Sequence, residues 1–115
     1  MQAHEHVNSA QVIANYELLS TLTVQMREAA ELEKWDELIS IEQQCSELVE
    51  TMKPIDAAVE LDEAARNYKN QLIQKILADE AMIRNHTQSW MKQLKHLMES
   101  NRQEQRLQQT YGAVD

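Results

Sequence analysis

Few residues in this chain of 115 could do chemistry, and they do not come together in a recognisable site. The run His-Glu-His at residues 4–6 could contact a metal ion, but no matching ligands stand nearby and a structural site needs about four. Cys45 lies in an apolar helical pattern without an adjacent histidine, which indicates an inert core thiol. Lys92 and His96 indicate a solvated basic face.

The sequence also lacks the common catalytic motifs. It has no metalloprotease helix motif, no glycine-rich phosphate loop and no strand-turn-helix nucleophile elbow. We therefore expect no enzymatic activity, no metal and no cofactor.

Composition predicts an all-α fold. One Gly, one Pro and no Phe leave too few turn formers for a sandwich, a barrel or a doubly wound sheet. Apolar residues make up 43% and charged residues 26%, as in soluble helical bundles and coiled coils. The length suits one domain over residues 1–115.

The net charge of −8 opposes direct binding to nucleic acid or to an anionic membrane face. Residues 1–61 carry three Lys or Arg against twelve Asp or Glu, whereas residues 62–115 carry eight against seven. No apolar run approaches the roughly 18 residues of a membrane span, so we expect no membrane insertion. One cysteine and no visible signal peptide favour the cytosol.

Helical patterns divide the chain into four segments, which we expect to form a small elongated antiparallel bundle. Asn8 and Gln11 have capping-box spacing at the start of the first helix, and Pro54 should end the second. Because no Gly stands at the first turn, one continuous helix over residues 8–52 is the alternative, although such length is rare in a small domain. The expected helices cover about residues 8–32, 35–52, 62–99 and 101–111.

The third helix is predicted to be too long for its partners and to overhang them. A helical wheel gives it a stripe to bury, made of Ala65, Tyr68, Leu72, Ile76, Ile83, Trp90, Leu94 and Leu97. A second strip lies further round the helix and contains Ile73, Leu77, Met91 and Met98, with Arg84 and Thr87 between its members. Two strips indicate one internal and one external partner; the alternative is that both are core or form a dimer seam.

Two further features bear on this helix and on the segment that follows. Asp79 and His86 fall on the stripe to be buried, so either they are bonded there or the helix is open to water at those turns, and we favour open turns. Ser100 with Gln103 should cap a short fourth helix whose large apolar residues are only Leu107 and Tyr111. That helix should therefore dock weakly.

Several stretches together resemble the FliT family of flagellar export chaperones, in order, over about residues 10–112. They are Trp35-Asp36-Glu37-Leu38, Ile76-Leu77-Ala78-Asp79-Glu80 with Ile83, the pair Leu94 and Leu97, and Arg102-Gln103 running to Tyr111-Gly112. The chain departs from relatives at Glu33 and Glu99, where some have a helix-breaking Gly.

The resemblance implies a cytosolic chaperone that binds the filament-cap protein FliD and prevents its premature polymerization. It also implies contact with the flagellar export ATPase complex and, in some relatives, binding to FlhC of the master activator, which represses flagellar operons. The resemblance implies a client-binding surface at Ile73, Leu77 and Arg84, on the strip that also contains Met91 and Met98. An autoinhibitory last helix would fold back through Leu107 and Tyr111, with the inhibitory contact at Tyr111.

Two other functions compete with this interpretation. One is a structural coiled-coil adaptor without a client, in which the second strip of the third helix mediates self-association. The other is an acidic decoy that occupies a DNA-binding surface through residues around Glu28, Glu31 and Glu37. We expect a homodimer; a monomer with a docked fourth helix is the alternative.

Overall fold

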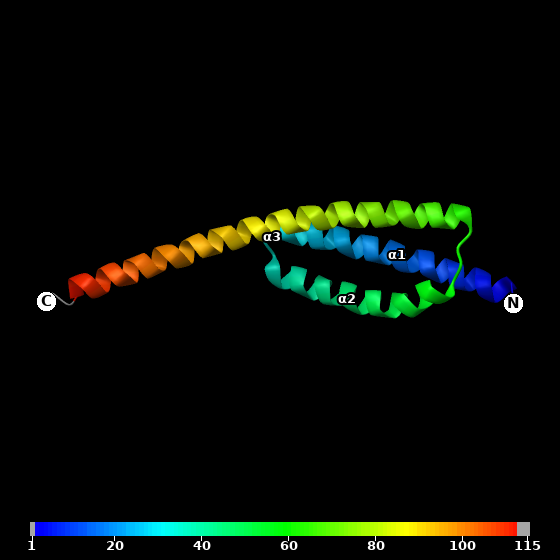
Figure 1. Cartoon of the computed structure of the whole chain (residues 1–115), viewed down its shortest axis with the longest axis horizontal. Coiled ribbons are helices and arrows are strands. Elements are labelled where there is room, and N and C mark those ends of the chain that lie inside the picture. The colour runs from blue at the N-terminus through cyan, green and yellow to red at the C-terminus, as the bar shows by residue number, and fades with distance from the viewer. Residues whose placement is uncertain (1, 113–115) are drawn as a thin grey trace. The chain divides into compact units, whose positions relative to one another are not determined.

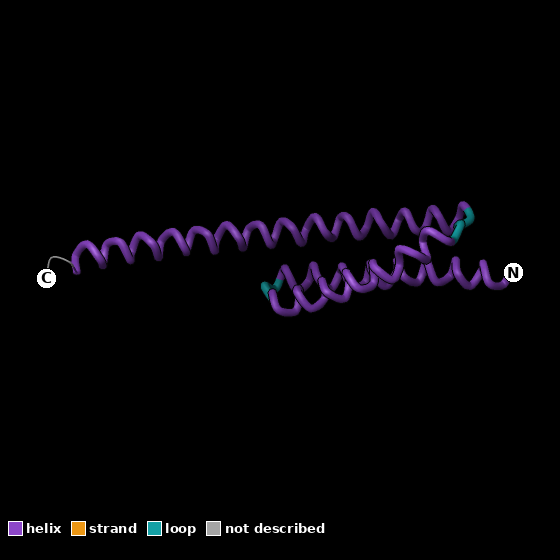
Figure 2. Tube along the Cα trace, turned by 60° about the horizontal axis from the view of Figure 1, so that its bottom comes forward, coloured by secondary structure: helices purple, strands orange, loops and turns teal. Residues whose placement is uncertain are grey.

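The computed structural model describes the backbone of residues 2–112 and the side chains of residues 8–100, 102, 103, 106 and 107. This part of the chain contains α1 (Gln2–Glu31), α2 (Trp35–Ala58) and α3 (Glu63–Gly112), and no strand. The all-α prediction is confirmed, and the prediction of four helices is wrong. The chain divides into two compact units, Met1–Ile83 and Arg84–Asp115. In the first unit, α2 runs antiparallel to α1, and the beginning of α3 runs back beside them (Figures 1 and 2).

A tight turn at Glu33 separates α1 from α2. Glu33 adopts φ 56°, its N–H donates to the carbonyl of Ala30 at 3.1 Å, and the N–H of Lys34 donates to the carbonyl of Ala29 at 2.8 Å. These two bonds form a Schellman motif with a non-glycine residue in the left-handed position. The predicted break is confirmed without the Gly that usually supplies it.

α1 begins at Gln2, and not at Asn8 as its capping pattern predicts. Residues 2–7 contain neither Gly nor Pro, so nothing in their backbone opposes a helix that has already formed downstream. A capping residue stabilises a helix end but does not prevent the helix from extending past it.

α2 continues through Pro54 to Ala58, so the predicted end near residue 52 is wrong. Proline inside a helix removes one backbone bond and costs about 3 kcal/mol. Tertiary contacts on both sides of the proline oppose that cost. Met52 is buried, and the hydroxyl of Tyr16 donates to Oδ2 of Asp56 at 2.5 Å, which ties the last turns of α2 to α1.

α3 begins where predicted and ends later. Oδ1 of Asp62 accepts the N–H of Ala65 at 2.8 Å, which caps the first turn. The helix then passes Ser100 and runs to Gly112, so the separate helix at 101–111 is absent. Residues 99–111 contain no Gly or Pro and are rich in Gln, Glu and Arg, so their propensity favours continuing the helix over using the Ser100 cap.

The core of the first unit lies where α1 packs against α2. Buried Leu22, Ala29 and Ile41 pack with Met26, Leu38, Cys45 and Leu48. α3 adds buried Ile76 and Ile83. Its predicted stripe is buried only up to that point, because Leu94 and Leu97 are exposed in the second unit and Tyr68 is 41% exposed.

Asp79 is buried and paired, so our expectation of a turn open to water is wrong at this position. It is 4% exposed, and its two oxygens accept bonds from Arg27 at 2.7 Å and from Lys75 at 2.9 Å. Arg27 lies on α1, so the pair joins α1 to α3. The wheel placed Asp79 on the inward face but could not identify a cation on another helix.

The turn geometry predicts that Glu33→Gly stabilises the protein by about 1 kcal/mol, because Gly adopts the left-handed conformation without the steric cost of a Cβ. Urea unfolding followed by circular dichroism measures the change. Glu47→Gly is the matched control: Glu47 is exposed inside α2, where Gly should cost about 1 kcal/mol. A destabilised Glu33→Gly variant would contradict the turn.

The contact between Tyr16 and Asp56 predicts pH-dependent stability. Burial, then the hydrogen bond and charge of Asp56, raises the pKa of Tyr16 from 10.0 to about 12. The unfolded phenol ionises near pH 10 while the folded one keeps its proton, so the folded state loses this stabilisation as the pH rises from about 10 to 12. We expect Tyr16→Phe to lower the free energy of unfolding by about 1.5–3 kcal/mol at pH 7. The variant should not show the loss of stability that ionisation of Tyr16 causes between about pH 10 and 12.

Tyr68→Phe is the control for this variant. The hydroxyl of Tyr68 donates to Oε2 of Glu17 at 3.2 Å in an exposed position, so its removal should cost less than that of Tyr16. Equal losses in the two variants at pH 7, measured by urea unfolding, would show that Tyr16 does not hold α2 on α1.

Candidate functional site

Two adjoining cavities lie among the three helices of the first unit, with volumes of about 320 and 400 Å³. Leu19 of α1, Val49 of α2, and Ile76 and Glu80 of α3 line both of them. We call the combined hollow the interhelical groove. Its other apolar lining residues are Met26, Cys45, Met52, Ile73 and Leu77.

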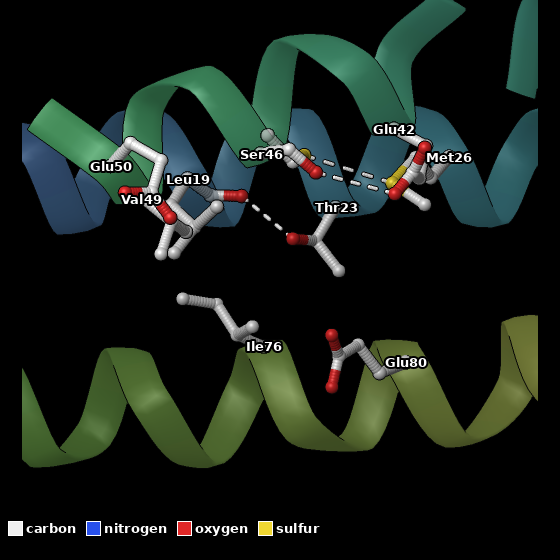
Figure 3. Close-up of a pocket in the computed structure, with 10 residues that line it drawn as sticks. Leu19, Thr23, Met26, Glu42, Ser46, Val49, Glu50, Ile76 and Glu80 are labelled. Carbon is white, nitrogen blue, oxygen red and sulfur yellow. Dashed lines mark hydrogen bonds between the residues drawn. The ribbon is translucent and has the colours of Figure 1, made fainter. Parts of the chain in front are cut away.

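The groove is mainly apolar at its centre. Figure 3 shows Ile76 and Glu80 projecting from α3 toward α1 and α2, with Ile76 opposite Leu19 and Val49 and Glu80 opposite Thr23. Both hydroxyls that α1 contributes to the lining are bonded: that of Thr23 donates to the carbonyl of Leu19 at 2.7 Å, and that of Tyr16 donates to Oδ2 of Asp56 at 2.5 Å. An apolar surface of this kind is suited to binding apolar side chains of a partner.

Carboxylates surround the apolar centre. Glu42 and Glu50 on α2 and Glu80 on α3 line one cavity, and Asp56 with Glu80 lines the other. Burial, then the charges of Glu42 and Glu80, raises the pKa of the Cys45 thiol, which lies between these walls. The groove therefore combines apolar side chains with negative potential.

Cys45 is a free thiol, and its side chain lines the groove. Its Sγ lies 3.7 Å from Sδ of Met26, a contact between two soft, polarizable groups in the core. A raised pKa keeps the thiol protonated at neutral pH, which opposes a nucleophilic role.

The predicted client residues fall into both units. Ile73 and Leu77 line the groove; Ile73 is half-buried and Leu77 is 54% exposed. Arg84, Met91 and Met98 follow at seven-residue spacing on the helix of the second unit, where both methionines are at least half exposed.

The two predicted autoinhibitory residues lie further along the same helix. Leu107 is 55% exposed, and the side chain of Tyr111 lies outside the described residues. The fold-back that would bring them onto the client surface requires a helix break near Ser100, and α3 has none.

Sequence reasoning missed the contribution of α2 to the groove. Val49, Met52 and Asp56 recur at spacings of three and four on the face of α2 that lines it. The wheel of α3 could separate an outer strip, but a wheel of one helix cannot show that a second helix supplies the opposite wall. The excess of acidic residues over residues 1–61 was the feature of the sequence that could have indicated the carboxylates of the groove.

The described part of the chain offers no metal site and no membrane-spanning helix. No three His, Cys, Asp or Glu side chains there are grouped so that they could hold a metal ion. The side chains of residues 4–6 lie outside it. Within the same residues, no helix has both the length and the apolar character to cross a membrane.

Comparison with known proteins identifies the family. Residues 13–113 match the model of the family described as flagellar protein FliT. The structure is similar to the crystal structure of flagellar protein FliT from Bordetella bronchiseptica, with a TM-score of 0.67 and 31% sequence identity over 75% of this chain and 98% of that one. No protein of curated function matches significantly. Because the family model covers most of the sequence, the resemblance is confirmed, and the chain belongs to the FliT family of flagellar proteins.

Proposed function

We propose that the protein is a flagellar export chaperone that binds the filament-cap protein FliD and prevents its polymerization before export. Family membership supports a flagellar chaperone role. The observation that carries the proposal is the exposure of Leu77, 54%, beside half-buried Ile73 in a groove lined by three helices.

The groove explains how such a chaperone would act. A partner helix with an apolar face can bury Leu77 and Ile73, and each fully buried side chain of this size contributes about 1.5–3 kcal/mol. The segment of the client bound in this way is not free to pair with another client molecule. Binding energy alone accomplishes this, so the proposed function needs no nucleotide and no catalytic group.

Arg84, Met91 and Met98 are proposed as further client contacts on the second unit. Met91 is 57% and Met98 50% exposed, and unbranched methionine side chains adapt to partner surfaces of varied shape. Contacts with the export ATPase complex and with FlhC, which would make the protein a repressor of flagellar operons, are further proposals from family membership. A cytosolic location and a homodimer belong to the same proposal.

Substitution of the groove residues tests client binding. We expect Ile73→Ser with Leu77→Ser to weaken FliD binding at least about 100-fold in calorimetry, because two apolar contacts are lost. Ile39→Ser is the matched control, since Ile39 is 55% exposed on α2 and lines neither cavity of the groove. Circular dichroism establishes that each variant remains helical.

The same variants separate the chaperone from a coiled-coil adaptor. If the double variant keeps its affinity for FliD, the groove is not the client site. If its affinity is unchanged and its oligomer dissociates in sedimentation equilibrium, the groove mediates self-association and the adaptor function is correct.

Residues 100–115 are proposed to regulate client binding. Because α3 is continuous through Ser100, this regulation requires a second state in which the helix breaks there and the tail competes for the groove. Ending the chain after Glu99 should then tighten FliD binding about 3- to 10-fold, since the competing state is removed. Leu107→Ser in the full chain should give part of this gain, and unchanged or weaker binding in the truncated protein would exclude a competing tail.

A further inference from the structure

We infer that the interhelical groove selects a cationic amphipathic helix, one that carries Lys or Arg beside its apolar face. This rests on the proposed function and specifies the chemistry of the partner segment. Three features of the groove support it: its dimensions, the distribution of its carboxylates, and a carboxylate oxygen that lacks a partner.

The dimensions suit a helix of about four turns. The lining residues of α2 run from Glu42 to Asp56, which corresponds to about 21 Å at 1.5 Å per residue. Along this wall the lining residues recur every three or four positions, as they must where two helices pack lengthwise. An extended peptide would present alternate side chains to opposite sides and would match this spacing less well.

Carboxylates stand on both sides of the apolar centre. Glu42 and Asp56 lie toward the two ends of the α2 wall, and Glu80 lies on the α3 wall. Among the described residues, Lys53 is the only cation lining either cavity, and its Nζ lies 2.9 Å from Oε1 of Glu50 in an exposed pair. Lys53 therefore offsets Glu50 and leaves the other three carboxylates to face a partner.

Asp56 offers a specific acceptor. Its Oδ2 accepts the hydroxyl of Tyr16, whereas its Oδ1 is buried without a hydrogen-bond partner among the described residues. A buried carboxylate oxygen without a donor is unfavourable, so a donor from a partner side chain has an unsatisfied group to bond. Because the chain's own atoms cover this oxygen, the Asp56 side chain must turn outward before a Lys or Arg at the edge of the bound helix can supply the donor and a compensating charge.

The charge of the first unit favours the same partner at longer range. Residues 1–83 carry six Lys or Arg and sixteen Asp or Glu. This negative potential accelerates the approach of a cationic helix, and salt screens the effect. The carboxylates of the groove and the overall charge of the first unit thus both favour a cationic helix. The experiment must distinguish these two contributions.

Two synthetic helical peptides of about 18 residues test the inference. At 1.5 Å per residue, a helix of this length is slightly longer than the groove. Both have the same leucine face; one carries Lys along the two flanks and the other Glu. We expect the Lys peptide to bind the full chain about tenfold more tightly at 50 mM salt, a ratio that falls severalfold at 500 mM. Fluorescence anisotropy of the labelled peptides gives both affinities.

Charge-reversal variants place the selection in the groove. Glu80→Lys should reduce the preference for the Lys peptide to about threefold or less. Glu47→Lys is the matched control, because Glu47 is exposed on α2, carries the same charge and lines neither cavity. It should leave the preference near its original value. If both variants reduce the preference equally, overall charge selects the peptide and the inference is overturned.

Leu77→Ser distinguishes failure of this inference from failure of the proposed function. If the two peptides bind equally, and Leu77→Ser weakens both, the apolar groove remains a binding site and selection by charge is wrong. If neither peptide binds, the groove does not accept amphipathic helices of this length and the inference is overturned, while the FliD measurements still decide the proposed function.

Discussion

The ion pair between Arg27 and Asp79 fixes how α3 lies on α1, and the groove depends on that register. Asp79 is 4% exposed, and breaking a buried ion pair costs up to about 3–5 kcal/mol, although Lys75 of the same helix would still bond the other oxygen of Asp79. A shift of α3 along or around its axis would break this bond. With the bond made, Ile76 and Ile83, three residues before and four after Asp79, face inward and are buried, and Leu77 is left on the outer side.

Within the first unit, three helices leave a place where a fourth can pack. Buried small residues, Ala29 and Ala30, line the end of α1 near the turn, where bulkier side chains would hold α2 further away. Side-chain bonds join α3 to α1 through Glu17 and Arg27, and the lining of the groove comes from all three helices. A helix that enters the groove would complete a bundle of the common four-helix kind, so the proposed client binding follows the same packing rules as core formation.

Sequence patterns predicted some features that depend on one helix alone and failed at two that depend on another helix, the passage of α2 through Pro54 and the burial of Asp79. They also failed at Asn8 and Ser100, where a capping pattern did not stop a helix. The break before Trp35 and the start of α3 are local properties and agree with the structure. The helix through Pro54 is not local, because Tyr16 and Met52 help hold it in place. The same limit applies to the site: the sequence separated Leu77 from the core, but the opposite wall and its carboxylates became visible only when α2 was placed beside α3.

The carboxylates of the groove also bear on whether two copies could pair through this surface. An exposed apolar surface attracts any similar surface, including the same groove on a second copy. Two grooves brought together would place Glu80 and Asp56 of each copy near the same residues of the other, and like charges that lose water repel strongly. A cationic helix meets no such opposition. The carboxylates therefore oppose self-association through this surface and do not oppose the proposed cationic partner.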